Sequence, residues 1–198
     1  MPIDRKIYKV LFYKGNLPEW TCPTCNKGIL KGKDGSFSYK EQKESFEAHG
    51  HEDWEPDWIS YVYSCQFVCT NPSCEDTVVN VGTGSLNYEP EKYDEDGEPK
   101  GIRYFEYFQP KFFIPHLNIF KIAKNTPDEI KISIDESFKL FFANPASSLS
   151  HLRIALEKLL DNLKIKKFVN NKKGRRIPIT LHDRIDLLPK KFENFKDL

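Results

Sequence analysis

Two pairs of cysteines constrain this chain more than any other feature of its sequence. Cys22 and Cys25 enclose two residues, whereas Cys69 and Cys74 enclose four. Thiolates from two such turns can converge on one Zn²⁺ ion with tetrahedral geometry and sulfur–zinc distances of about 2.3 Å. Because four thiolates complete the coordination shell and leave no position for water, the pattern predicts a structural Zn²⁺ ion. The alternative is four reduced cysteines that bind no metal.

Three other residues are weaker candidates for the same site. Cys65 precedes Cys69 by four residues on a predicted strand, a span of about 13 Å, so we interpret it as a core residue. His49 and His51 could replace a thiolate, but four cysteines suffice, and surface histidines are the simpler interpretation. An odd total of five cysteines also argues against a disulfide framework.

The spacing of apolar residues predicts strands in the first part of the chain. In segment 59–69, every second residue contributes to one apolar face, which is typical of a strand: Tyr61, Tyr63, Cys65, Phe67 and Cys69. We expect further strands at 6–13, 76–82 and 102–113. Segment 89–101 is acidic and contains Pro and Gly, which favours a loop or hairpin tip.

From residue 126 onward the apolar period becomes helical. One predicted face carries Ile130, Ile134 and Phe138, and a second helix carries a stripe of leucines from Leu149 to Leu163. A basic linker or hairpin is expected at 164–176, followed by a short helix capped by Thr180. We therefore predict an α+β fold, with a small β-rich zinc-ribbon unit over residues 1–120 and an α-helical domain over residues 121–198.

Composition limits the class and location of the protein. Apolar residues make up 39% and charged residues 30% of the 198 residues, the balance of an ordinary soluble chain. No apolar run approaches the ~18 residues that cross a bilayer, so we expect no membrane partner. The N-terminal segment lacks the apolar core of a secretory signal, which predicts a cytoplasmic location.

Positive charge is concentrated in the second half of the chain. Residues 125–198 contain 15 Lys and Arg against 10 Asp and Glu, although the whole chain has a net charge of only +1. A dense basic run could neutralise the phosphates of RNA or DNA. It consists of Lys164, Lys166, Lys167, Lys172, Lys173, Arg175 and Arg176. Bases could stack on Tyr104, Phe105, Tyr107 or Phe108, although these aromatic residues could equally fill the core. A solvated surface is the alternative interpretation of the charge.

Several short motifs between Phe108 and Leu188 resemble the bacterial family called domain of unknown function 4145. They are Pro115, the segments Thr126–Ile130, Asp135–Ser137, Ser148–Glu157 and Leu181–Ile185, and within them Arg153, Ala155, Leu156 and Glu157. The resemblance implies a HEPN-like helical domain behind an N-terminal four-cysteine zinc ribbon. Several HEPN proteins are ribonucleases of toxin–antitoxin and phage-defence systems.

The sequence departs from the catalytic pattern of that family. A late helix with an Arg or Lys and a Gly-Asn-x-x-x-His segment does not follow Leu188 in the given sequence, so either the chain is a fragment or the helical domain is shortened. The spacing from Arg175 or Arg176 to His182 resembles the Arg-to-His spacing of catalytic HEPN proteins. However, Pro178 lies between them, so they cannot share one continuous helix. Arg153 and Glu157 lie one helical turn apart and are expected to form a structural ion pair. We therefore assign no catalytic residue.

The sequence thus predicts a zinc-binding accessory or interaction module in a bacterial phage-defence or toxin–antitoxin setting, rather than an enzyme. A protein partner or a second copy is the expected ligand. The alternatives are a nucleic-acid-binding protein and a HEPN-type ribonuclease without its final catalytic helix.

Overall fold

The computed structural model describes residues 8, 11–94, 96–97 and 99–189. The chain divides into two compact units, Met1–Lys121 and Ile122–Leu198. Each unit is described by itself below.

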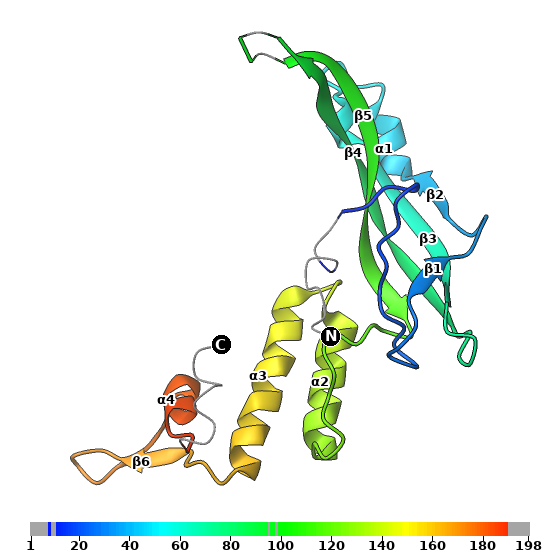
Figure 1. The fold of residues 1–198 in the computed structure, drawn as a ribbon. Coiled ribbons are helices and arrows are strands. Elements are labelled where there is room, and N and C mark those ends of the chain that lie inside the picture. The colour runs from blue at the N-terminus through cyan, green and yellow to red at the C-terminus, as the bar shows by residue number, and fades with distance from the viewer. Residues whose placement is uncertain (1–7, 9–10, 95, 98, 190–198) are drawn as a thin grey trace. The chain divides into compact units, whose positions relative to one another are not determined.

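A five-stranded antiparallel sheet forms the first unit (Figure 1). Its strands are β1 (Leu30–Gly32), β2 (Ser38–Glu41), β3 (Ser60–Cys69), β4 (Thr77–Tyr93) and β5 (Pro99–Ile114). The order is β1-β3-β4-β5, and β2 pairs with the same edge of β3 as β1 does. Helix α1 (Lys43–Ala48) and the 3₁₀ helix η2 (Pro56–Trp58) lie in the connection between β2 and β3.

One face of the sheet carries an aromatic core. Tyr63, Cys65, Phe67 and Cys69 alternate as buried residues along β3, which confirms the predicted strand and its apolar face. Trp20 is completely buried beside this face, with its ring edge-on to Phe67 at 5.3 Å between centroids. Segment 11–22 therefore covers the sheet as an irregular stretch. Of the strand predicted at 6–13, half of the positions lie outside the described residues, and Phe12 forms only an isolated bridge to Phe108.

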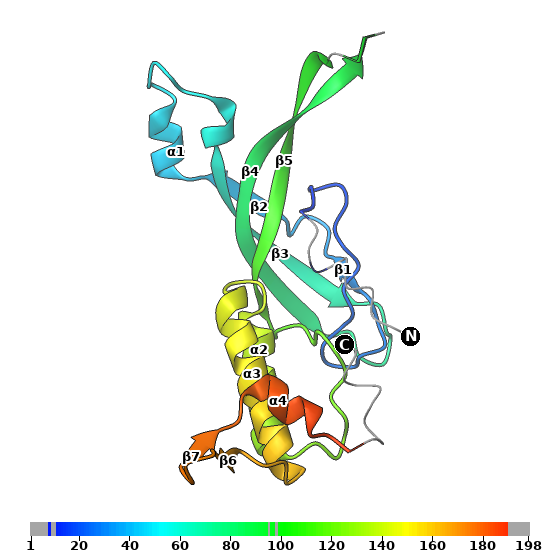
Figure 2. The same ribbon diagram turned by 90° about the vertical axis from the view of Figure 1, so that its left-hand side faces the viewer.

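Strands β4 and β5 continue well beyond the end of β3 (Figure 2). The last β3–β4 pair is Ser60 with Ser85, whereas β4 and β5 stay paired as far as Tyr93 and Pro99. Segment 89–101, predicted as a loop or hairpin tip, is the end of the β4–β5 hairpin, but most of it is strand, at 89–93 and 99–101. Charged side chains and prolines hide the alternation in this exposed two-stranded ribbon, while cross-strand hydrogen bonds still hold it.

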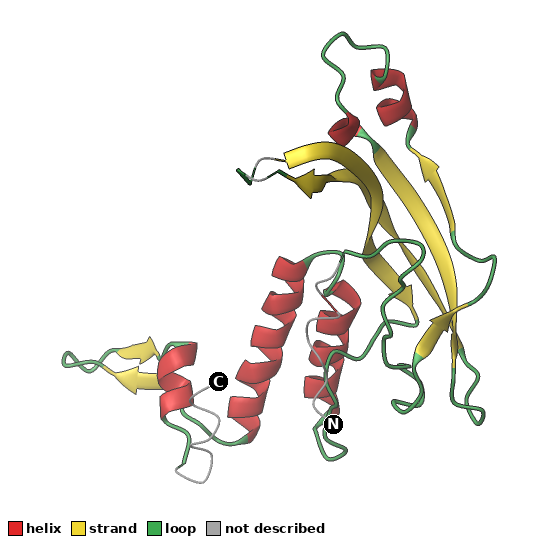
Figure 3. Ribbon diagram, turned by 45° about the horizontal axis from the view of Figure 1, so that its top comes forward, coloured by secondary structure: helices red, strands yellow, loops and turns green. Residues whose placement is uncertain are grey.

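In the described part of the second unit, residues 122–189, the structure has three helices and a small hairpin. They are α2 (Asp128–Leu140), α3 (Pro145–Asn162), β6 (Phe168–Asn170), β7 (Arg176–Pro178) and α4 (Leu181–Asp186). Helices α2 and α3 lie side by side (Figures 1 and 3). The predicted face of α2 is confirmed, because Ile130, Ile134 and Phe138 are buried. Thr180 caps α4 as expected, since its hydroxyl accepts a hydrogen bond from the Asp183 N–H.

The predicted fold class is wrong in its second half. The structure is a mixed α+β fold dominated by β-sheet, and no HEPN-like helical domain is evident. Among the described residues, two of the four α-helices span only six residues each. The leucine stripe correctly indicated a helix at α3, but periodicity along one helix does not reveal how many helices pack around it. The basic segment after α3, predicted as a linker or hairpin, forms the β6–β7 hairpin.

None of the helices in the described ranges combines the length and the apolar character needed to span a membrane.

Candidate metal centre

Four cysteines from two separate turns meet at one end of the sheet. Cys22 and Cys25 lie in the loop that precedes β1, Cys69 is the last residue of β3, and Cys74 lies in the turn that leads to β4. Their Sγ atoms all lie within 4.8 Å of one another. The separation is 3.9 Å between Cys22 and Cys74 and 3.6 Å between Cys25 and Cys69. Sulfurs bound to zinc at about 2.3 Å in a tetrahedron lie about 3.8 Å apart, so the donor set fits one tetrahedral ion.

Strand pairing explains why the two turns meet. Leu30 of β1 is the register partner of Cys69 on β3, which brings the first turn beside the end of β3. The first turn closes on itself through hydrogen bonds from the Cys22 N–H to Gly28 O (2.8 Å) and from the Leu30 N–H to Trp20 O (2.7 Å). The sheet register thus positions cysteines that are 44 residues apart in sequence.

Backbone amides also donate hydrogen bonds to the sulfurs. The Gly28 N–H donates to Cys25 Sγ at 3.3 Å, and the Asn71 N–H donates to Cys69 Sγ at 3.4 Å. The hydrogen bond from Gly28 is the main reason that the pKa of Cys25 is lowered to about 6, since it favours the thiolate. Burial raises the pKa of Cys69 to about 12. A bound dication would favour the thiolate form of both residues.

Residues outside the cysteine motifs complete the turns. Asn26 and Glu75, each directly after the second cysteine of a pair, have positive φ angles of 53° and 48°. Asn118 donates from its side-chain amide to Pro23 O at 2.9 Å, and so holds the first turn from a distant part of the chain. The Thr24 hydroxyl donates to Asp76, which links the two turns. Sequence reasoning missed Asn118, because nothing in the local pattern joins it to a cysteine turn.

Gly28 is the missed residue with the clearest steric role. A Cβ at this position would collide with Cys69 Sγ and would lie 2.9 Å from the backbone nitrogen of Asn71. We therefore expect Gly28→Ala to weaken zinc binding by about tenfold or more, because the collision displaces a ligand and its hydrogen-bond donor. Competition with a chromogenic chelator measures this affinity. Gly50→Ala is the matched control, since its Cβ would meet only Glu47 O at 3.8 Å; equal affinities of the two variants would contradict the role of Gly28.

The weaker candidate ligands lie apart from the four cysteines. Cys65 is buried on β3 with Sγ at 3.7 Å from Ser36 Oγ, and burial raises the pKa of its thiol. His49 Nε2 lies 2.9 Å from Glu41 Oε1, and His51 Nδ1 lies 3.9 Å from Asp53. None of the three belongs to the cluster of four.

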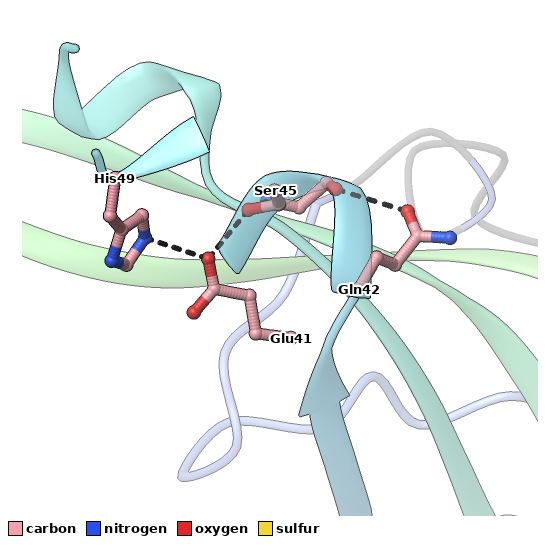
Figure 4. A network of polar contacts seen from close by, with 5 residues as sticks. Glu41, Gln42, Ser45 and His49 are labelled. Atoms are coloured by element: carbon pink, nitrogen blue, oxygen red, sulfur yellow. Dashed lines mark hydrogen bonds and ion pairs between the residues drawn. The ribbon is translucent and has the colours of Figure 1, made fainter. Parts of the chain in front are cut away.

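His49 takes part in a polar network with Ser45 and Glu41 (Figure 4). These are the residue types of a serine-hydrolase triad, but they are connected in a different order. Glu41 Oε1 accepts a hydrogen bond from Ser45 Oγ at 2.6 Å and also contacts His49 Nε2 at 2.9 Å. A catalytic serine needs the imidazole between itself and the carboxylate, whereas here the carboxylate lies between the other two. Ser45 also accepts from the Ser60 N–H at 3.0 Å, so the network joins β2, α1 and β3 structurally.

Arg176 and His182, whose spacing resembles that of a HEPN catalytic pair, lie on two different elements. Arg176 lies on β7, where its guanidinium covers the ring of Phe168, whereas His182 lies on α4 with Nε2 at 3.8 Å from Asp186. The expected ion pair between Arg153 and Glu157 is present, at 3.3 Å on the exposed surface of α3. Of the candidate stacking aromatics, Phe108 is completely buried in the core, whereas Tyr104 is exposed on the ribbon.

The fold and the site define a β-rich protein whose four clustered cysteines can hold a metal ion. The family model described as Domain of unknown function (DUF8608) matches residues 10–113, more than half of the chain, and the chain belongs to this family. The match contains all four cysteines and nearly all of the sheet. No curated protein and no solved structure matches the chain.

This assignment corrects the family expected from the sequence. The chain is a member of the DUF8608 family and not of the domain of unknown function 4145 family, and its β-dominated fold differs from a HEPN-like helical domain. Most of the motifs behind the earlier resemblance lie in or near α2–α4, outside the matched range. They are short runs of common helix-forming residues, which the structure uses for an exposed ion pair and for ordinary helix packing. The HEPN ribonuclease and the defence setting depended on that resemblance, and neither the structure nor the comparisons test them.

Proposed function

We propose that Cys22, Cys25, Cys69 and Cys74 bind one structural Zn²⁺ ion, and that the first unit is a zinc-stabilised module that binds another protein. The observation that carries the zinc proposal is the meeting of four thiols within 4.8 Å on two turns. Four sulfur donors in tetrahedral array favour zinc among common ions. They also leave no open coordination position, which favours a structural role for the ion over a catalytic one.

The position of the cluster supports a structural role. It connects the loop before β1, the end of β3 and the turn into β4, which are joined otherwise mainly by backbone hydrogen bonds. One ion would therefore fix three segments at the end of the sheet opposite the ribbon. Such coupling of metal binding to folding is typical of small metal-binding units.

An exposed aromatic surface on the β4–β5 ribbon supports the binding role. Tyr88 pairs with Tyr104 across the ribbon, and Ile102 lies on the same face two residue pairs further along, opposite Pro90. Their side chains are 59%, 47% and 58% exposed. Glu89 and Glu91 alternate with the residues of this face along β4 and so lie on the opposite face of the ribbon, which leaves the aromatic face apolar at these pairs. The complementary partner is therefore a protein surface with an apolar centre.

One purification tests both parts of the proposal. The full chain, isolated by an affinity tag from its source cells, is expected to contain one zinc per chain by elemental analysis and to retain a specific protein. Well under one zinc per chain, or the visible absorption of an iron–sulfur cluster, would contradict the zinc assignment. The double variant Tyr88→Ser, Tyr104→Ser should keep the zinc and lose the protein, because it removes exposed apolar area only. Equal recovery of that protein with both forms would exclude the ribbon as its binding surface.

A further inference from the structure

The β6–β7 hairpin of the second unit combines unpaired positive charge with an exposed aromatic ring. We infer that this hairpin binds single-stranded nucleic acid through its phosphates and by stacking, without base-specific contacts. The inference concerns a different unit from the zinc site and does not depend on it.

Most of the basic side chains of the hairpin are free to meet phosphates. Lys167 pairs with Asp161 at 2.5 Å. Within the part of the chain that the structure describes, the other members of the basic run have no acidic partner: Lys164, Lys166, Lys172, Lys173, Arg175 and Arg176. Basic side chains that no acid already neutralises contribute most to the affinity for a nucleic-acid backbone, because each phosphate contact releases a condensed counterion.

The tip of the hairpin is an ordered turn. The side-chain oxygen of Asn171 accepts hydrogen bonds from the N–H groups of Lys173 and Arg175, both at 2.9 Å. Gly174 has a φ of 73°, a conformation that favours glycine. The turn therefore presents Lys172, Lys173 and Arg175 in a defined arrangement, which lowers the entropy lost on binding.

Next to the tip lies a concave surface suited to a nucleotide. The guanidinium of Arg176 lies over the ring of Phe168, 3.9 Å from its centroid, and Phe168 remains 40% exposed. A concavity of about 530 Å³ is lined by Lys166, Lys167, Phe168, Val169, Asn170 and Arg176. The cations around this concavity are Lys166, Lys167 and Arg176, and Asn170 supplies an amide. Arg176 and Phe168 also form the stacked planar pair. A base can stack on the planar pair while its phosphate contacts Lys166, which has no acidic partner among the described residues.

The base of the hairpin is held by the helices. The Ile179 N–H donates to Lys167 O at 2.8 Å, and Arg184 of α4 donates to Ile165 O at 3.2 Å and to Asp161 of α3 at 2.7 Å. The hairpin itself protrudes from the helices (Figure 3). A fixed base and a protruding tip suit a strand that passes along the hairpin.

The arrangement favours nucleic acid over an anionic membrane. Insertion into a membrane would need a free apolar edge. Here, however, the guanidinium of Arg176 covers one side of the Phe168 ring, and the exposed apolar residues Val169 and Ile177 form only one cross-strand pair. A flat guanidinium on a ring is instead a platform for a base.

Fluorescence anisotropy of the full chain with labelled oligouridylate and oligothymidylate of about 20 nucleotides tests the inference. We expect binding at about 0.05 M salt that weakens steeply toward 0.2 M. The triple variant Lys172→Gln, Lys173→Gln, Arg175→Gln should bind at least tenfold more weakly. Its salt dependence should fall by about two units of logarithmic slope, because three phosphate contacts are lost. Arg176→Lys should weaken binding with little change in slope, because the charge remains but the planar stack is lost.

The matched control removes three exposed lysines from the first unit, as Lys31→Gln, Lys33→Gln and Lys40→Gln. It changes net charge by the same amount and should bind nearly as wild type does. The inference is overturned if wild type binds neither oligonucleotide at the lower salt, or if the two triple variants bind equally. Binding to phosphatidylserine vesicles without binding to oligonucleotides would also overturn it and assign the hairpin to a membrane surface.

Discussion

Replacing Cys22 by Ser is expected to abolish stoichiometric zinc binding and to remove the cooperative unfolding of the first unit. Cys22 is completely buried, and its Sγ lies 3.9 Å from that of Cys74, so a serine there removes one of four converging donors. Structural zinc sites contribute apparent binding free energies of about 10–16 kcal/mol. That range overlaps the upper half of the ~5–15 kcal/mol that stabilises a typical whole domain. Elemental analysis and thermal unfolding followed by circular dichroism measure the two effects.

Cys65→Ala separates the loss of a cysteine from the loss of a ligand. Cys65 is buried on the same sheet but stands outside the cluster, so this variant should retain one zinc per chain. Its unfolding should shift by about 1 kcal/mol, the cost of a small cavity. A Cys22→Ser protein with full zinc and an unchanged melting temperature would refute the four-cysteine site.

Asp161→Ala is expected to destabilise the second unit by about 3 kcal/mol, because it leaves the Arg184 guanidinium buried without its partner. Arg184 is only 4% exposed, and its Nη2 donates to Asp161 Oδ1 at 2.7 Å. Lys167 binds the other carboxylate oxygen at 2.5 Å, so one acid connects α3, α4 and the base of the hairpin. Urea unfolding with hydrogen exchange over α3 and α4 measures the loss.

The pKa of Asp161 predicts how this pair responds to acid. Burial alone would raise the pKa, but the hydrogen bonds from Lys167 and Arg184 outweigh it and lower the pKa below its ordinary value. A lowered pKa in the folded state contributes stability above the unfolded value of about 4, and that stability is lost as the pH falls below it. Asp161→Ala should therefore differ from wild type at neutral pH and approach it in acid.

Glu157→Ala is the matched control on the same helix. Its partner Arg153 is 66% exposed and water replaces the lost contact, so the cost should stay below about 1 kcal/mol. If both alanine variants lose equal stability, the buried pair has no special role in the unit.

The sequence alone determined those features that depend on local pattern. The spacing of Cys22, Cys25, Cys69 and Cys74 identified the cluster that the structure brings together. Period-two alternation identified β3, and period 3.6 identified the buried face of α2. Each of these signals lies within one turn or one element, where residue type and backbone geometry are directly linked.

Short helical motifs led to the wrong prediction of a HEPN-like domain, because local patterns do not specify a whole domain. The segment with Arg153 and Glu157 is a helix, as its composition requires, but the number and order of its neighbours follow from packing. The chain belongs instead to a family whose match lies over the sheet and the cysteines. Short helical motifs carry little information about fold, because many folds use the same helix-forming residues.

Only the tertiary structure decided how distant segments complete the sites. Asn118 reaches the first cysteine turn from 95 residues away, and Gly28 is required because Cys69 occupies the space beside it. Arg184 meets Asp161 across 23 residues because α4 folds back on the end of α3. The exposed ribbon exists because β4 and β5 stay paired beyond Ser60, the first residue of β3. In each case the deciding contact joins residues whose spacing along the chain has no period, so it arises from strand register and packing alone.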